Sequence, residues 1–479
     1  MRLEISRRQL LQSLGNGFGV LGLAGVLDEA GLLAADAGTV NHPVGDNLVP
    51  RPGHYPGKAK AVIQLFQSGG PSQMDLFDHK PALTKHNGQP HPNPEVFETL
   101  NQAGNRNVLM GTAFEFAHHG ECGMHLSELI PHLSGVTDDL CLVRSMHTAH
   151  NNHPFAISMM QTGKTFLGRP AMGSWICYGL GSENRNLPGY IVLRDPAGYN
   201  PSGKTVWSNG WLPAIYQGTE FSSSGTPVLW MDPERPRSAK ARARSQKFLS
   251  LLNEGHLLRH PGESELDARV QNFELAARMQ LEATDVLDIS SETEATRKMY
   301  GLDNEVTAGY GMRCLMARRM VEAGVRFVQV FPPVGQPWDN HGQLISGLKT
   351  VCDKTDHGSA ALIRDLKQRG LLDEVIIMWT GEFGRLPITQ GADGRDHNRN
   401  AFSLLMAGGG FKAGHTHGET DEFGYRSVEG RVSVPDLHAT ILHQLGIDHH
   451  QLSYPHAGRP ERLTDPEVTG ARVVEDLLV

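Results

Sequence analysis

Four short segments of the chain each deliver a carboxylate beside an apolar run, and two of them add an imidazole. Mixed His, Asp and Glu ligation suits zinc, manganese or another divalent ion, and carboxylates readily bridge two metals. Because the same chemistry recurs, the pattern favours a metal site. The alternative is that these residues cap helices and turns. In chain order the segments are Asp75–Asp78, Trp338-Asp339-Asn340-His341, Thr380-Gly381-Glu382-Phe383-Gly384-Arg385 and Gly394-Arg395-Asp396-His397-Asn398.

The apolar runs beside these segments predict the elements that position them. They lack the alternation of a half-exposed strand, and they are interleaved with stretches of helical periodicity, which predicts an α/β fold with a parallel sheet covered on both faces. In such a sheet ligands bind outside the carboxyl ends of the strands. The predicted strands are Ala59–Gln67, Leu140–Arg144, Tyr190–Leu193, Arg326–Phe331, Glu374–Trp379 and Ala401–Ala407, and the predicted helices are Leu266–Leu287, Gly309–Ala323, Gly358–Arg369 and Pro435–Leu445.

Composition excludes several classes of function. The 479 residues carry a formal net charge of −8, which argues against binding of a nucleic-acid backbone, since such proteins normally have a basic face. The one long basic run, Arg235–Lys247, is interpreted as a solvated helix face. The five cysteines are dispersed without a CxxC pair, which excludes a disulfide framework and a zinc ribbon.

The N-terminal segment is expected to be an export signal. Ser6-Arg7-Arg8-Gln9-Leu10-Leu11 and the apolar run Leu14–Leu27 resemble the twin-arginine signal of bacteria. A soluble amphipathic helix is the alternative. We therefore predict a signal peptide over residues 1–37, a linker over 38–58 and a single α/β domain over 59–479, exported to the periplasm or the extracellular space. No later stretch approaches 18 consecutive apolar residues, so no stable membrane span is predicted.

Six stretches, taken in order, resemble an exported bacterial family, domain of unknown function fifteen hundred and one, within the alkaline phosphatase and sulfatase superfamily. The resemblance extends from Lys60 to Leu478. It implies a large, mainly parallel sheet sandwiched between helices, with one or two divalent ions (zinc, manganese or calcium) at the strand ends. The stretches are VIQLFQSGGPSQMDLFDHKP, VRSMHTAHNNHPFAISMMQTG, WDNHGQ, GEFGR, GRDHN with AFSLLMAGGG, and VPDLHATILHQLGI.

The resemblance also implies which residues bind metal. Where the superfamily usually has an Asp-His pair, this chain has Glu382-Phe383, so one imidazole is missing, and Asp396 is a candidate to compensate. The implied metal ligands are Asp75, Asp339, His341, Glu382, Asp396 and His397.

The expected catalytic residues follow from the same resemblance. The superfamily nucleophile should begin the helix that runs up to Gly163, and counting back places Asn152 or His153 there, neither of which is a hydroxyl or a thiol. Thr148 is the nearest hydroxyl upstream. Asn152 is a candidate to hold an ester oxygen, and His153 to serve as nucleophile, acid or ligand. Arg385 and Arg395 are candidates to clamp an oxyanion, with surface ion pairing as their alternative role.

Two functions remain open at this point. The first is an exported, metal-dependent hydrolase of sulfate or phosphate esters, with metal-activated attack at the carboxyl ends of the strands and a small or polymeric anionic ester as substrate. The sulfatase kinship makes sulfated polysaccharide one such substrate. The second is a non-catalytic member of the superfamily that acts as a binding or surface-assembly module. The carboxylate and histidine set favours the first function, and the missing Ser, Thr or Cys favours the second.

Overall fold

The computed structural model describes residues 48–92, 105–224, 239–260 and 264–479. The predicted signal peptide lies outside the described residues, as do residues 38–47 of the predicted linker. Export by the twin-arginine route therefore stays a prediction. Among the helices of the described ranges, none is both long enough and apolar enough to cross a bilayer.

A nine-stranded sheet forms the centre of the fold, in the order β13-β5-β12-β9-β1-β8-β6-β7, with β16 paired to β5. Every residue of the three central strands β1, β8 and β9 is buried, as expected for strands covered on both faces. The predicted α/β architecture is therefore confirmed. The strands are β1 (Ala61–Phe66), β5 (Leu140–His147), β6 (Tyr190–Arg194), β7 (Thr219–Ser222), β8 (Phe327–Val330), β9 (Val375–Thr380), β12 (Phe402–Ala407), β13 (His415–His417) and β16 (Val432–Ser433).

One strand of this sheet runs against the others. Strands β9, β1, β8, β6 and β7 are mutually parallel, and β13 and β16 are parallel to β5. Strand β12 is antiparallel to both of its neighbours, β5 and β9. Because β12 is reversed, its amino end lies at the same edge as the carboxyl ends of β1, β5, β8 and β9. Residues that precede β12 can therefore meet residues that follow the other four strands.

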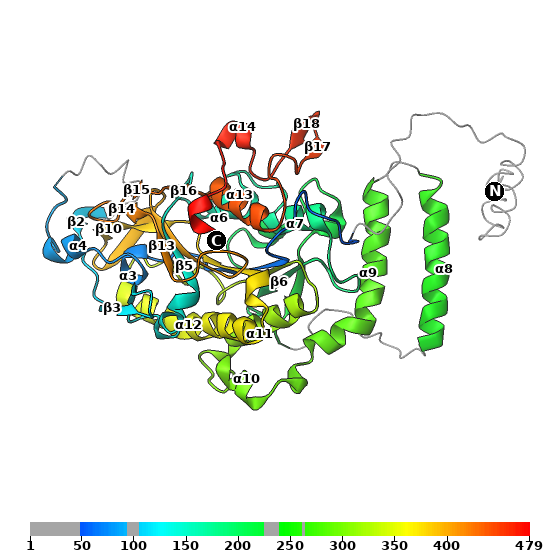
Figure 1. The fold of residues 1–479 in the computed structure, drawn as a ribbon, viewed down its shortest axis with the longest axis horizontal. Coiled ribbons are helices and arrows are strands. Elements are labelled where there is room, and N and C mark those ends of the chain that lie inside the picture. The colour runs from blue at the N-terminus through cyan, green and yellow to red at the C-terminus, as the bar shows by residue number, and fades with distance from the viewer. Residues whose placement is uncertain (1–47, 93–104, 225–238, 261–263) are drawn as a thin grey trace, which may run out of the picture. The chain divides into compact units, whose positions relative to one another are not determined.

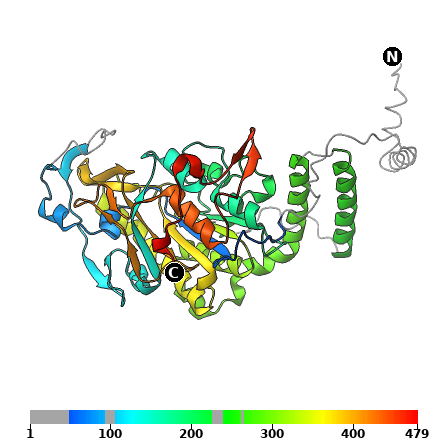
Figure 2. The same ribbon diagram turned by 45° about the horizontal axis from the view of Figure 1, so that its top comes forward.

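Helices cover both faces of the sheet (Figures 1 and 2). On one face lie α11 and α12, which pack on each other, and α11 contacts β1 and β8. The other face carries α6, α7 and α13. The helices in the described ranges are α3 (Gln73–Leu76), α4 (Pro81–Lys85), α5 (Pro131–Ser134), α6 (His153–Thr162), α7 (Met172–Leu180), α8 (Ala239–Leu257), α9 (Ser264–Leu287), α10 (Glu294–Met299), α11 (Ala308–Glu322), α12 (Leu344–Gln368), α13 (Val434–Gln444) and α14 (Pro466–Thr469).

A smaller sheet lies beside the carboxyl edge and carries part of the site. It has the order β11-β10-β2, and the antiparallel pairing of β10 with β11 sets Arg385 opposite His397. Its strands are β2 (Asn105–Leu109), β10 (Gly384–Gln390) and β11 (Gly394–Asn398), and three hairpins are formed by β3 (Phe116–His119) with β4 (Met124–Ser127), β14 (Glu419–Thr420) with β15 (Ser427–Glu429), and β17 (Tyr454–His456) with β18 (Arg459–Glu461).

Candidate metal centre

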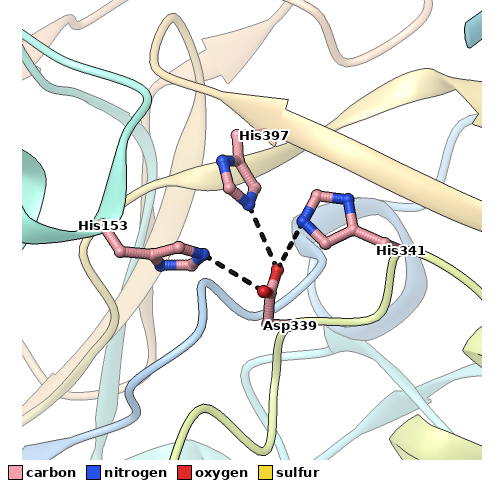
Figure 3. A group of neighbouring side chains, drawn as sticks. All are labelled: His153, Asp339, His341 and His397. Carbon is pink, nitrogen blue, oxygen red and sulfur yellow. Dashed lines mark hydrogen bonds and ion pairs between the residues drawn. The ribbon is translucent and has the colours of Figure 1, made fainter. Parts of the chain in front are cut away.

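Three imidazoles and one carboxylate meet at the carboxyl edge of the sheet (Figure 3). Each of His153, Asp339, His341 and His397 offers one ligand atom, and the four atoms lie within 4.8 Å of one another. Asp339 is at the centre: its Oδ1 is 3.0 Å from His341 Nε2 and 3.1 Å from His397 Nε2, and its Oδ2 is 3.3 Å from His153 Nε2.

The topology explains why residues so distant in the sequence converge. His153 begins α6, directly after the loop that leaves the carboxyl end of β5. Asp339 and His341 lie in the loop that leaves the carboxyl end of β8. His397 is on β11, which leads into the amino end of the reversed strand β12. All three connections therefore emerge at one edge of the sheet, which is where parallel sheets place their ligands.

A hydrogen bond at Nδ1 orients each of the three imidazoles. His153 Nδ1 lies 2.8 Å from Glu382 Oε1, His397 Nδ1 lies 2.7 Å from the carbonyl oxygen of Asn151, and His341 Nδ1 contacts Gln390 Oε1. Because carboxylate and carbonyl oxygens only accept hydrogen bonds, each Nδ1 is the donor. In a neutral ring the Nε2 lone pair is then left facing Asp339. Metal-bound histidines typically have such an acceptor behind the ring.

The electrostatics of the group follow from this packing. Burial disfavours charge on Asp339, but the three imidazoles and the Arg385 guanidinium, 2.7 Å from Oδ1, outweigh it and hold the pKa of that carboxyl well below its usual range. Burial also opposes charge on His153, yet the carboxylates of Asp339 and Glu382 raise the pKa of its imidazole. For His397, burial and the nearby Arg385 guanidinium outweigh the hydrogen bond with Asp339 and lower the pKa of the imidazole.

Two buried atoms of the group form no hydrogen bond within the described part of the chain. They are Nε2 of His153, which lies 3.3 Å from the carboxylate of Asp339, and Oε2 of Glu382, which is behind His153. A lone pair that faces a carboxylate is repelled by it unless a proton or a cation lies between them. Three imidazole nitrogens and one carboxylate oxygen are a common tetrahedral set for zinc. The residues present therefore fit a divalent cation.

The structure brings together three of the six predicted metal ligands: Asp339, His341 and His397. Glu382 and Asp396 lie immediately behind them, since Glu382 accepts from His153 and Asp396 Oδ1 accepts the backbone N–H of His397 at 2.8 Å. The position expected for the nucleophile, His153, supplies the fourth group of the cluster.

Asp75 lies outside the cluster. It is fully buried in α3, and its Oδ2 accepts hydrogen bonds from Arg395 Nε at 2.8 Å and from the Ser72 hydroxyl. Its Oδ1 faces a second nitrogen of the same guanidinium at 3.3 Å. Both oxygens of Asp75 are thus held by an internal ion pair rather than directed at the three imidazoles.

The two arginines expected to clamp an oxyanion are buried and bonded to protein acceptors. Arg385 donates to the carbonyls of Gly70, Arg395, Gly69 and Trp338 and to Asp339. Arg395 donates to the carbonyls of Leu386 and Met110 as well as to Asp75. Neither guanidinium is presented to a substrate; Arg385 instead fixes and charge-balances Asp339.

The remaining candidates lie at the start of α6. Asn152 is its exposed N-cap residue, and its side chain makes no capping hydrogen bond. Thr148 follows β5 and is buried; its backbone N–H donates to the Arg399 carbonyl at 2.9 Å, while its Oγ1 has no hydrogen-bond partner in the described ranges. Sequence reasoning missed Gln390 and the carbonyl of Asn151, for which no motif gives a signal.

A family model described as "Protein of unknown function (DUF1501)" matches residues 59–478. The chain belongs to the DUF1501 family. This match confirms the resemblance based on the six sequence stretches. A comparison of the DUF1501 chain with curated proteins finds no match.

Solved structures with a similar fold include three named as sulfatase, phosphatase or phosphonate monoester hydrolase. The phosphonate monoester hydrolase SpPMH from Silicibacter pomeroyi is 12% identical over 72% of each chain, with a TM-score of 0.32. The PsFucS1 sulfatase from Pseudoalteromonas sp. is 10% identical over 81% of this chain and 68% of its own, with a TM-score of 0.31. A mutant of the TAB5 alkaline phosphatase with bound Mg is 10% identical over 81% and 98%, with a TM-score of 0.36.

Proposed function

We propose that this protein is a metal-dependent hydrolase of sulfate or phosphate esters that acts outside the cytoplasm. One observation carries the proposal: three imidazoles, each held by an acceptor at Nδ1, direct Nε2 at the carboxylate of Asp339. Such an arrangement concentrates negative charge and lone pairs at one point, which a divalent cation stabilises.

The ligand set narrows the choice of metal. His153, His341 and His397 would bind through nitrogen and Asp339 through oxygen. Calcium prefers oxygen ligands throughout, so zinc or manganese fits better. A bound divalent cation would neutralise charge on the ester oxygens and lower the pKa of a coordinated water.

The chain's own residues would bind and orient the ester. The first turn of α6 begins at the cluster, and unpaired N–H groups at a helix start attract anions. Asn152 is exposed at this turn, so its amide can reach an ester oxygen. Arg385 holds Asp339 in place, and Thr148 is the nearest hydroxyl candidate for a covalent step.

Export and substrate class are further parts of the proposal. The paired Arg7 and Arg8 before an apolar run support the twin-arginine route. A small or polymeric anionic ester, sulfated polysaccharide included, is the substrate class we propose.

Elemental analysis of the full chain, purified without chelators, tests the metal. We expect about one zinc or manganese per chain, and its loss in Asp339→Asn. His450→Gln, at an exposed histidine outside the cluster, is the matched control and should retain the metal. A panel of aryl sulfate, phosphate and phosphonate esters then tests hydrolysis, which His341→Ala should abolish.

A non-catalytic role is favoured by a different observation. The two buried arginines, Arg385 and Arg395, donate their hydrogen bonds to protein acceptors, and the cluster contains no hydroxyl or thiol. If the protein holds stoichiometric metal yet cleaves none of the esters under any metal supplement, a binding or surface-assembly module is the better assignment.

A further inference from the structure

Helix α8 packs along α9 through a face that carries Ser250. The two helices lie side by side in Figures 1 and 2, and Ser250 Oγ donates to Glu274 Oε1 across 3.3 Å. Ser250, Asn253 and Leu257 are half-buried and recur at the spacing of one helix face. That face of α8 is therefore the one in contact with α9.

The opposite face of α8 is apolar and exposed. Phe248, Leu251 and Leu252, with Leu258 directly after the last residue of α8, follow the three-, four- and seven-residue spacing of a single stripe, and they are 61%, 58%, 46% and 80% exposed. Leu249, beside the stripe, is exposed as well. An amphipathic helix of a globular protein normally buries this face. Exposed apolar patches of this kind mark a surface that binds another molecule.

Positive charge is concentrated at the amino end of the same helix. Lys240, Arg242, Arg244 and Lys247 lie in its first half, and Glu254 is the one acidic residue of Ala239–Leu257. Arg244 and Lys247 are exposed, and Arg244 stands one helical turn before Phe248. This local excess of cations contrasts with the net charge of −8 of the chain.

We propose that α8 docks in the plane of a membrane that carries anionic headgroups. The apolar stripe would enter the boundary between headgroups and acyl chains, while Arg244 and Lys247 meet lipid phosphates. The helix is 19 residues long and is not apolar enough to span a bilayer, so it lies along the surface. A second copy offers poorer charge complementarity, because its α8 brings the same cations and one acid.

Vesicle co-sedimentation of the full chain tests this docking. Vesicles of 70% phosphatidylcholine and 30% phosphatidylglycerol should bind the protein, and vesicles of phosphatidylcholine alone should bind it far less. Phe248→Ser with Leu252→Ser should reduce binding at least tenfold. Arg244→Gln with Lys247→Gln should reduce it roughly fivefold per charge at low salt.

Matched controls keep the result specific to α8. Leu167→Ser and Val468→Ser alter comparably exposed apolar residues elsewhere and should bind like wild type. Because every variant retains the N-terminal apolar run, a difference between them reports α8 itself. Unchanged circular dichroism and metal content show that the variants fold.

Three outcomes would overturn the proposal. Equal binding to both vesicle types would show that anionic headgroups do not contribute to the affinity. Binding that both α8 double variants retain assigns the affinity to another segment. Concentration-dependent dimerisation that Phe248→Ser with Leu252→Ser abolishes, without vesicle binding, assigns the face to a second copy. None of these outcomes depends on ester hydrolysis.

Discussion

Glu382 Oε1 accepts the Nδ1 proton of His153 across 2.8 Å, and it also accepts the backbone N–H of Gly69 at 2.8 Å. The carboxylate is completely buried, so it holds the imidazole in one tautomer and one orientation. A carboxylate behind a metal-binding histidine also makes the ligand nitrogen more basic. Glu382 therefore acts on the proposed metal through His153.

Replacement of this carboxylate should weaken metal binding without abolishing it. For Glu382→Gln we expect a 10–100-fold loss of zinc affinity, measured by competition with a chromophoric chelator. Glu419→Gln, at an exposed glutamate, is the control and should bind zinc like wild type. An affinity unchanged in Glu382→Gln would mean that the carboxylate does not support the ligand.

Asp75→Asn should lower the free energy of unfolding and leave the metal content unchanged. The substitution leaves the buried Arg395 guanidinium without its counter-charge, which typically costs about 3–5 kcal/mol in the free energy of unfolding. Urea denaturation measures this cost, and elemental analysis should find the metal content unchanged. Asp353→Asn breaks an exposed pair with Lys349 and should cost no more than about 1 kcal/mol.

The opposite result would restore the sequence-based assignment of Asp75. If Asp75→Asn loses the metal while its urea midpoint stays near that of Asp353→Asn, the side chain is a ligand, and the ion pair with Arg395 is not maintained in the metal-bound protein.

A side chain at Gly69 is expected to destabilise the fold. Its φ is +114°, and a Cβ there would lie 2.6 Å from the backbone nitrogen of Asp339. Gly88 also has a positive φ, of +78°, but a Cβ there meets nothing within 4 Å. Both alanine variants lose roughly 1–2 kcal/mol from the backbone conformation, so Gly69→Ala should lose about 1–3 kcal/mol more from overpacking. Equal melting temperatures for Gly69→Ala and Gly88→Ala would mean that a Cβ at residue 69 does not crowd the backbone nitrogen of Asp339.

Acid sensitivity should depend on His438. This imidazole is fully buried in α13 and donates Nε2–H to the Met160 carbonyl at 2.9 Å, and burial lowers its pKa to about 4. In the unfolded chain the value is about 6.5, so only the unfolded state is protonated between the two values. Its contribution to stability is therefore complete above about pH 6.5 and is lost as the pH falls toward 4, by roughly 3 kcal/mol.

Urea unfolding between pH 7.5 and 4.5 checks this sign. His438→Gln should lose less stability than wild type as the pH falls, whereas His450→Gln, at an exposed histidine, should follow the wild-type curve. Parallel curves for all three proteins would mean that His438 titrates alike in the folded and unfolded states.

The central sheet could be predicted because both of its faces are covered. Strands such as Ala61–Phe66 and Val375–Thr380 are apolar runs, and the predicted ends of these two were wrong by at most two residues. Strand β5 extends three residues past its predicted end at Arg144. The β10–β11 pair gave no such signal, since Gly394–Asn398 is polar although all five residues are buried. The predicted helix Gly358–Arg369 covers only the second half of α12, although the buried residues Leu344, Leu348 and Val351 of the first half do follow helical spacing. Helix α7 was not among the predicted helices.

The site was predictable in place but not in detail. Asp339, His341 and His397 follow or precede apolar strands, so the topology alone brings them together. The ion-pair partner of Asp75 is Arg395, a residue of β11 more than 300 positions away. Which ring nitrogen of His153 faces Asp339 depends on Glu382. Spacing along the chain contains neither fact.

The reversed strand β12 has a consequence for the order in which the chain becomes able to fold. Strand β5 ends at His147, yet its partners β12, β13 and β16 begin at Phe402, His415 and Val432. During synthesis β5 and one edge of β9 therefore remain unpaired until the last fifth of the chain leaves the ribosome. Such unpaired edges promote aggregation, so a nascent chain of this topology needs protection until its carboxyl-terminal segment arrives.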